Sequence, residues 1–374
     1  MKRLALLISL AAMTMPLSGA AEPDRHAPFE TRAVWVTRWA FKDSSDVRAI
    51  FRDLANIGVN TVFFQVRGSC DALYRSSLEP WSDLLTGHLG ADPGWDPLET
   101  ALEEGRGRGI EVHAWINVFT GWQVTDSGVP PPVCDPPHVL TDHPEWLASD
   151  AQGQRMSLLK SENERSYAFL SPTHEDVQDH ILAVVRELVG RYDLDGLHLD
   201  YVRFPDSTYS YDADTKAAYR LDGILGGVGQ EVPSFTEWRV SRLNDFVGRI
   251  ARNARAVRPG IEVSAAVWQK IDDAREVYFQ DGIEWMRGGH LDFVVPMLYT
   301  ASVETFGERL DTYVGPVGAG KVVAGLGPYL EAFTDSIMAA ELSKAEERKV
   351  RGYSIFNSDF AIKYGHILKE YGPN

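Results

Sequence analysis

The sequence is poor in cysteine, in positive charge and in long apolar runs. Only two of its 374 residues are cysteines, and 37 Lys and Arg residues stand against 53 Asp and Glu residues, which gives a formal charge of -16. The sequence also has no basic stripe, so we expect no nucleic-acid partner. No segment stays apolar for the roughly 20 residues that a membrane-spanning helix needs, so we expect no transmembrane segment.

Motifs that mark several other kinds of protein are also missing. No phosphate-binding glycine pattern follows the first expected strand, and there is no Gly-x-Ser-x-Gly elbow. His113 and His198 could both face the interior, but neither belongs to a His-x-His or His-Glu-x-x-His motif. We therefore predict no nucleotide cofactor, no serine-hydrolase chemistry and no metal site.

The first residues have the pattern of a secretory signal peptide. Lys2 and Arg3 precede a short apolar run, and small residues at 18–21 follow it. We predict that residues 1–21 are removed on export to the periplasm or the outside of the cell. No cysteine follows the small residues, so a lipoprotein anchor is not indicated. Export would permit a disulfide between Cys70 and Cys134, and two buried free thiols are the alternative.

An unbroken alternation of strand and helix patterns fills the rest of the chain. Short β-branched or aromatic runs predict strands at residues 32–37, 61–67, 111–117, 196–201, 262–268, 292–299, 321–327 and 352–357. Helical periodicity or helix-ending residues predict helices at 45–57, 97–108, 177–192, 236–256, 278–287, 303–313, 330–349 and 360–371. Eight such units favour a (β/α)₈ TIM barrel over an open doubly wound sheet. We expect residues 22–374 to form this single catalytic domain.

Two long polar segments interrupt the alternation after the third and fourth strands. They cover residues 118–172 and 205–234, and the first holds at most a weak local helix at 144–148. In a barrel both would be loops on the active-site face, where long loops usually form walls or lids.

The run DGLHLDYVRFP, residues 195–205, carries the clearest functional signal. Leu197 and Leu199 alternate with His198 and Asp200, so one face of this strand is polar and ends in an acid. A buried carboxylate is costly unless it is paired or used. We interpret Asp200 as a catalytic acid at the rim of the barrel. A structural ion pair with Arg203 is the alternative.

Polar and aromatic side chains gather near the same end of most predicted strands. Aromatic rings pack against the C–H faces of sugars, whereas amides and carboxylates bind hydroxyl groups. The cluster therefore predicts a sugar-binding cleft, although any one of its aromatics taken singly is better explained as core. The expected stacking walls are Trp35, Trp268 and Tyr299. The other expected substrate contacts are Gln65, Arg67, His113, Asn117, Tyr201 and Arg203.

Glycoside hydrolysis usually requires two carboxyl groups. Asp200 is the first, as nucleophile or base, and Asp71 is the provisional acid because it follows the second strand. The alternative for Asp71 is a turn residue that binds its own backbone. Further candidates are Glu79, Glu162 and Glu164, whereas Asp195 begins its strand and is expected at the wrong end of the barrel.

Several segments together resemble the glycosyl hydrolase-like family ten, a group of exported or surface bacterial proteins. They include RAVWVT, TVFFQVRGSCDALYRSSLEPWS, HPEWL, DFVVPMLY and the long run that ends in DGLHLDYVRFP. The resemblance implies a TIM barrel that hydrolyses glycans, in some members peptidoglycan strands stripped of their peptides. Matched by motif, the implied site comprises Gln65, Arg67, Asp71, Asn117, Asp200, Tyr201 and Arg203.

This chain departs from that family and from the chitinases at informative positions. Gly68-Ser69-Cys70 replaces a Pro-Asn-Gly found in many members, and only one acid, Asp200, follows His198 where many have two. The strand also resembles the chitinase pattern DGxDxDxE, but Val202 stands where the proton donor belongs. We therefore reject the chitinase mechanism and leave the second catalytic group open.

The sequence supports three hypotheses. The first is an exported glycoside hydrolase of an N-acetylated polysaccharide, with peptide-free peptidoglycan strands as the expected substrate and partner. The second is a non-catalytic glycan-binding barrel of the cell envelope, suggested by the missing second acid. The third is a structural envelope protein.

Overall fold

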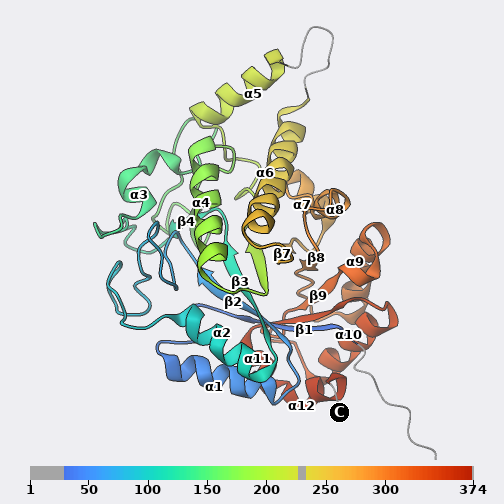
Figure 1. Cartoon of the computed structure of the whole chain (residues 1–374). Helices are drawn as coiled ribbons and strands as arrows, with labels where there is room; N and C mark the ends of the chain where they lie inside the picture. Colours follow the sequence, from blue (N-terminus) through green and yellow to red (C-terminus); the bar gives the residue numbers. More distant parts are fainter. Residues whose placement is uncertain (1–28, 226–232, 373–374) are drawn as a thin grey trace, which may run out of the picture.

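Eight parallel strands form a barrel, as predicted (Figure 1). The computed structural model describes residues 29–225 and 233–372, and the predicted signal peptide lies outside them. The strand order is β8-β7-β6-β3-β2-β1-β10-β9. The strands are β1 (Thr31–Val36), β2 (Thr61–Arg67), β3 (Glu111–Asn117), β6 (Gly196–Asp200), β7 (Glu262–Val267), β8 (Phe293–Pro296), β9 (Val323–Leu326) and β10 (Gly352–Phe356).

The barrel closes between β8 and β9 through sparse pairing. Two isolated parallel bridges, Val294–Val322 and Met297–Gly325, join these strands. The Leu298 amide also donates to the Gly325 carbonyl at 3.0 Å. Every other pair of neighbouring strands in the barrel forms a ladder of at least four residue pairs, so this seam is the most lightly bonded part of the ring.

Helices cover the outside of the barrel and follow the predicted order. They are α1 (Ser44–Ala55), α2 (Pro97–Arg108), α4 (Glu175–Arg191), α6 (Phe235–Val257), α7 (Ile271–Glu276), α8 (Gly282–Arg287), α9 (Val303–Val317), α10 (Asp335–Glu347), α11 (Ser358–Lys363) and α12 (Gly365–Leu368). None of the helices in the described parts of the chain is long and apolar enough to cross a bilayer.

Capping residues explain where the predicted helix boundaries were wrong. The helix expected at 278–287 begins only at Gly282, as α8, because Phe279 has a φ of 53° and Asp281 caps the helix. The short helix α7 precedes the expected range and was not predicted. The helix expected from residue 330 begins at Asp335, where the Thr334 side chain accepts a hydrogen bond from the Ile337 amide. The final helix is divided between α11 and α12.

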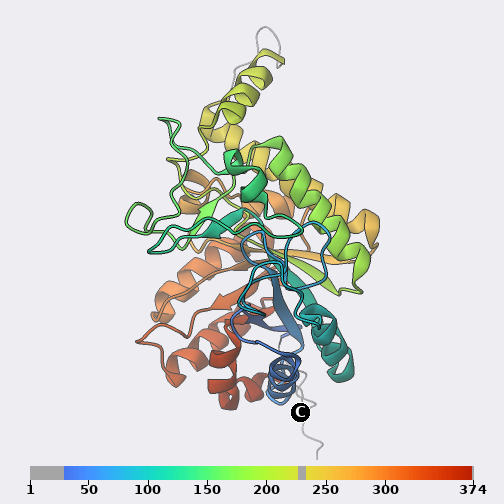
Figure 2. The same ribbon diagram turned by 90° about the vertical axis from the view of Figure 1, so that its left-hand side faces the viewer.

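The two insertions contain more structure than their sequences indicate. The first forms an antiparallel pair, β4 (Thr120–Gln123) and β5 (Tyr167–Phe169), with α3 (Val139–Asp142) and a 3₁₀ turn, Pro144–Trp146. These strands are only four and three residues long, too short for an alternating pattern to reveal them. The second insertion holds α5 (Ala213–Leu225), which projects from the barrel in Figures 1 and 2.

The two cysteines do not pair. Both are free, so the disulfide that export would permit is not formed in this structure. Cys70 is buried, and its sulfur contacts the Arg67 guanidinium at 3.1 Å and the Thr120 carbonyl at 3.4 Å. Cys134 instead packs against Gly90. The two sulfurs therefore have separate neighbours.

Strand alternation divides the buried side chains into two groups. One face of each strand packs outward beneath the helices and belongs to the large core, as Val34, Val62 and Leu199 do. The other face points into the barrel, where a separate cluster is rich in aromatic rings. This inner cluster contains Ala33, Trp35, Phe63, Trp115, Phe293, Val295 and Val323. This cluster fills the interior of the barrel beneath the residues of its mouth.

Candidate active site

A cleft of about 680 Å³ opens at the carboxyl ends of the barrel strands. This is the end at which TIM barrels place their active sites. Side chains from most strands and from the first insertion converge there. The lining residues are Trp35, Trp39, Gln65, Trp115, Asn117, Tyr167, Asp200, Tyr201, Arg203, Ala266, Met297, Tyr299, Tyr329 and Phe356.

Asp200 is the last residue of β6, and its side chain points into this cleft. It lies beside Asn117 in the register of β3 and β6, so an amide and a carboxyl come from adjacent strand ends. Tyr201 follows with a φ of 48°, and its amide donates to Asp200 Oδ1 at 2.6 Å. An N–H bond of this kind favours the charged form of the carboxyl.

The environment of Asp200 sets its ionisation. Burial raises the pKa of Asp200, while Arg203, the Tyr201 amide and the Trp115 indole act in the opposite direction. Arg203 Nη1 lies 3.6 Å from Asp200 Oδ1. Among the described residues, Asp200 is the only carboxylic acid that lines this cleft.

His198 forms part of the floor below Asp200. Its ring is stacked on Phe63 at a centroid distance of 4.0 Å. The Trp35 indole donates to His198 Nε2 at 3.1 Å, so Nδ1 carries the proton and donates to Ser264 Oγ at 2.9 Å. Burial lowers the pKa of His198 well below its ordinary value, which keeps the ring neutral. This arrangement fixes the orientation of Trp35 in the cleft wall.

Aromatic rings supply much of the remaining wall. Tyr299 and Trp35 were predicted here, whereas Trp39, Tyr167 and Phe356 were not. Trp39 remains 55% exposed, which leaves a broad ring face available at the rim. Trp39 lies three residues after β1, a position that the barrel interpretation could have assigned to the mouth. Tyr167 comes from β5, and no local signal in the sequence links it to the barrel.

A second hollow of about 720 Å³ adjoins the first. It shares Tyr167, Tyr201 and Arg203 with the cleft and adds Trp268, predicted as a stacking wall, among other residues. The Arg203 guanidinium lies 4.3 Å from the Tyr201 ring centroid and 5.5 Å from that of Trp268. The two hollows therefore form one elongated surface around Arg203.

Arg67 lies away from the cleft, which corrects its predicted position. It is completely buried and forms a two-pronged pair with Glu79, with Nε–Oε2 and Nη2–Oε1 distances of 2.8 Å. Alternation predicted that Gln65 and Arg67 share a face. The β2–β3 register shifts between these two residues, and this irregularity changes the direction of Arg67.

His113 is also misplaced by the sequence interpretation. It does point into the barrel, but it begins the inward row His113, Trp115, Asn117 and lies at the amino-terminal end. Asn117 lies four positions further along the strand, which is about 13 Å. Its neighbours are Phe63, Phe293, Glu111 and Glu262. The alternation of residues along a strand shows on which face a side chain lies, but not how far along the barrel axis it lies.

Asp71 does not line the cleft that contains Asp200. Its carboxylate accepts from the Ser69 amide at 2.6 Å, the local turn contact considered above, and pairs with Arg38 Nη1 at 3.2 Å. Arg38 also contacts the Tyr167 hydroxyl at 3.4 Å and donates its amide to Gln65 at 3.0 Å. Asp71 therefore contacts the cleft only through Arg38. Its own side chain lines a different hollow, which shares no lining residue with the cleft.

The other acids considered from the sequence occupy structural or peripheral places. Glu79 pairs with Arg67, and His180 Nε2 lies 2.9 Å from its carboxylate. Asp195 lies at the amino-terminal end, as expected, and accepts from the Val112 amide at 2.8 Å. Glu164 lines the second hollow and is exposed.

A parallel barrel with an acid, amides and rings at its mouth has the architecture of many glycoside hydrolases. The chain belongs to the glycosyl hydrolase-like 10 family, whose model matches residues 30–315. Glycosyl hydrolase DigH of Escherichia coli K12 is 29% identical over 265 residues, which cover 66% of this chain and 56% of that protein. Glycosyl hydrolase YngK of Bacillus subtilis 168 is 26% identical over 321 residues, covering 79% and 58% respectively. The chain thus spans just over half the length of these curated relatives.

Solved structures share the fold at low sequence identity. The glycoside hydrolase domain of PgaB (BpsB) from Bordetella bronchiseptica aligns with a TM-score of 0.68 at 15% identity, covering 91% of this chain and 98% of that domain. The catalytic domain of β-amylase from Paenibacillus polymyxa aligns with a TM-score of 0.57 at 13% identity, covering 92% and 95%. At these identities the likeness concerns the barrel alone.

Proposed function

We propose that the protein is an exported glycoside hydrolase of an N-acetylated polysaccharide, with peptide-free peptidoglycan strands as its substrate. The observation that carries this proposal is the Asp200 carboxyl, buried at the base of a cleft with aromatic walls and flanking amides. Trp35, Tyr299 and Trp268 would stack on sugar rings. Gln65, Asn117 and Tyr201 would bind hydroxyl or N-acetyl groups.

Asp200 acts as the nucleophile or base in this proposal. Both roles need the ionised carboxylate, which Arg203 and the Tyr201 amide favour against the effect of burial. Asp71 stays the provisional second acid, but its carboxylate lies 3.2 Å from Arg38 Nη1. This contact suits an indirect role, in which Asp71 positions Arg38 and Tyr167.

The proposal is tested by digesting purified peptide-free peptidoglycan strands and chitin oligosaccharides and identifying the products by mass spectrometry. We expect Asp200→Asn to fold normally and to lose roughly 10²–10⁴-fold in turnover, because the amide can neither attack nor accept a proton. Asp53→Asn, at a partly exposed position on α1, serves as the matched control. Unchanged turnover of Asp200→Asn would remove this residue from the mechanism.

A non-catalytic glycan-binding barrel is the second candidate. It is favoured by the absence of a second carboxylic acid from the cleft lining among residues 29–225 and 233–372. This candidate predicts that glycan strands bind without any release of reducing ends between about pH 4 and pH 9. Measuring both binding and reducing ends on the same strands separates the two functions.

A further inference from the structure

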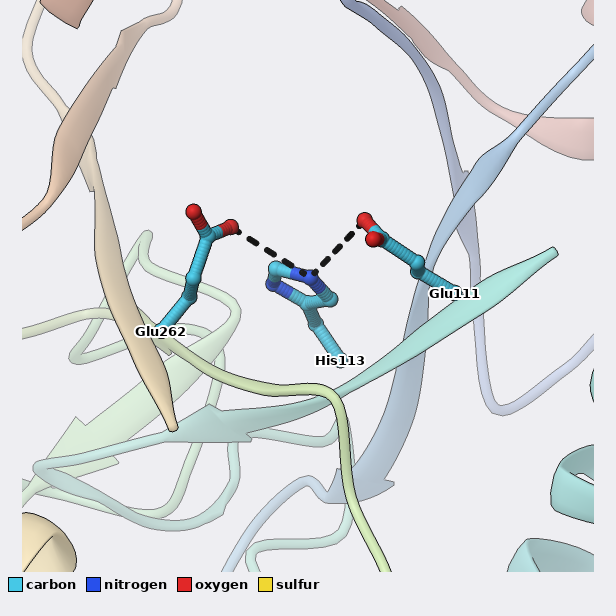
Figure 3. Close-up of side chains that lie close together, drawn as sticks. All are labelled: Glu111, His113 and Glu262. Carbon is cyan, nitrogen blue, oxygen red and sulfur yellow. Dashed lines mark ion pairs between the residues drawn. The ribbon is translucent and has the colours of Figure 1, made fainter. Parts of the chain in front are cut away.

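Three possible ligands for a metal ion lie together at the end of the barrel opposite the cleft. Glu111 is the first residue of β3 and Glu262 the first residue of β7. His113 lies two residues into β3, and Figure 3 shows its ring between the two carboxylates. One ligand atom from each residue lies within 4.8 Å of the other two.

His113 gives this cluster a feature that acidic residues alone would not have. Its side chain is 1% exposed, and neither ring nitrogen has a hydrogen-bond partner among the described residues. A buried polar group without a partner is costly. The ring is nevertheless held in place, because it packs against Gly196 so closely that a Cβ there would lie 2.2 Å from its Nδ1. Nε2 is directed at Glu111 and Glu262, at 3.9 and 4.0 Å.

We propose that Glu111, His113 and Glu262 bind one divalent transition-metal cation of the zinc type. Zinc takes imidazole nitrogen and carboxylate oxygen at about 2.0–2.2 Å, so two of its ligand atoms can be at most about 4.4 Å apart. The two separations that involve His113 already meet this limit. The Glu111 side chain is 60% exposed and is therefore free to complete the closure.

The neighbouring charged groups leave carboxylate oxygens of Glu111 and Glu262 available to bind a metal ion. Arg351 Nη2 holds Glu262 Oε1 at 2.8 Å, whereas the other oxygen, Oε2, faces His113. Among the described residues, no hydrogen bond to another side chain engages the Glu111 carboxylate. Glu111 and Glu262 also border a polar hollow of about 730 Å³, so both carboxylates lie beside a space that opens to solvent.

The position of the site defines its role. Strand β6 lies between β3 and β7 in the sheet, so an ion held by both would tie three strands together. Features of the amino-terminal end of a TIM barrel contribute to stability rather than to catalysis. The bound cation is therefore a structural link, and its existence does not depend on the proposed glycosidase activity.

The test uses the full chain, first treated with a chelator and then dialysed. Titration with ZnCl₂ should give about one equivalent by calorimetry and by elemental analysis after desalting. Ligand linkage predicts a Tm rise of about 4 °C when free Zn²⁺ is near 100 times the Kd. Glu111→Gln should weaken binding by at least about 100-fold, since even changes behind the ligands cost 10–100-fold.

Further variants keep the outcome interpretable. His113→Gln should abolish binding, and Glu111→Gln still tests the site if that buried variant fails to fold. Cys134→Ser, which removes a partly exposed thiol far from these ligands in the chain, should bind Zn²⁺ as the unmodified protein does. Absence of stoichiometric Zn²⁺, or equal affinity in Glu111→Gln and the unmodified chain, would overturn the proposal.

Discussion

Burial and a nearby cation act in opposite directions on the Asp200 carboxyl. Its pKa is raised by burial and lowered by Arg203. If Asp200 must be ionised to act, activity rises with pH through this pKa, and the acid limb of the pH profile reports it. The pKa of Asp200 therefore depends on Arg203, and the pH profile of activity can measure this dependence.

Arg203→Gln should move the acid limb of kcat/KM upward by about 1 pH unit or more, because removal of the cation makes ionisation harder. Arg203→Lys keeps the charge and should restore most of the original profile. The measurement is the rate of glycan cleavage between about pH 3 and pH 9. An acid limb that stays fixed would contradict this role, and movement of the alkaline limb instead would identify Asp200 as the proton donor.

Glu341 in α10 predicts a second pH dependence, this time of stability. Burial raises its pKa to about 9, and neither carboxyl oxygen has a partner among the described residues. The folded state therefore binds this proton more tightly than the unfolded chain does. The associated stability is complete below the ordinary pKa of glutamate and is lost as the pH rises towards 9.

Glu341→Gln should remove that dependence, because the amide does not titrate. The free energy of unfolding of the unmodified protein should fall relative to the variant between about pH 5 and pH 9, by at most about 1.4 kcal/mol per pH unit. Urea unfolding at several pH values measures the difference. Parallel curves for the two proteins would show that the Glu341 side chain reaches water.

At the scale of elements, the sequence predicted the eight barrel strands because each is a short β-branched or aromatic run. It placed Asp200, Asn117 and Gln65 at the mouth because they are polar residues at or near the ends of their strands. It failed for Arg67, because a register shift between strands leaves no local mark. It also missed Tyr167, which reaches the cleft only after two distant short strands have paired. The features that the sequence did not predict depend on contacts between segments that lie far apart in the chain.

The loop after β2 depends on one buried ion pair. Arg67 on β2 binds Glu79 in the loop, and His180 on α4 approaches the same carboxylate at 2.9 Å. Although burial opposes ionisation, Arg67 and His180 hold the pKa of Glu79 at about 2. The carboxylate thus links a strand, a loop and a helix.

Glu79→Gln should lower the free energy of unfolding by about 3–5 kcal/mol, because it leaves the Arg67 charge buried without compensation. Asp53→Asn removes a partner from the exposed Arg52–Asp53 pair and should change stability by less than about 1 kcal/mol. Urea unfolding of the three proteins is the measurement. Similar losses in both variants would mean that water reaches Arg67.

At the scale of the whole molecule, Gly325 on β9 affects both the closure of the barrel and the shape of the cleft. A Cβ at this position would lie 2.6 Å from the Pro296 carbonyl oxygen on β8 and 3.2 Å from the Trp35 ring. The first contact would be with the backbone of β8, across the sparsely bonded seam. The second would be with Trp35, which forms part of the cleft wall. Glycine is therefore needed here for close approach rather than for an unusual backbone angle.

Gly325→Ala should consequently lower the free energy of unfolding by about 1–3 kcal/mol, the usual cost of overpacking. It should also weaken glycan binding, because Trp35 must move. Gly107→Ala is the matched control: it lies in α2, a Cβ there meets no atom within 4 Å, and helix propensity predicts a gain of up to about 1 kcal/mol. The same chemical change should thus have opposite signs at the two sites. Equal stability of Gly325→Ala and the unmodified protein would mean that the β8–β9 seam yields without cost, and the barrel would then be open rather than closed at that point.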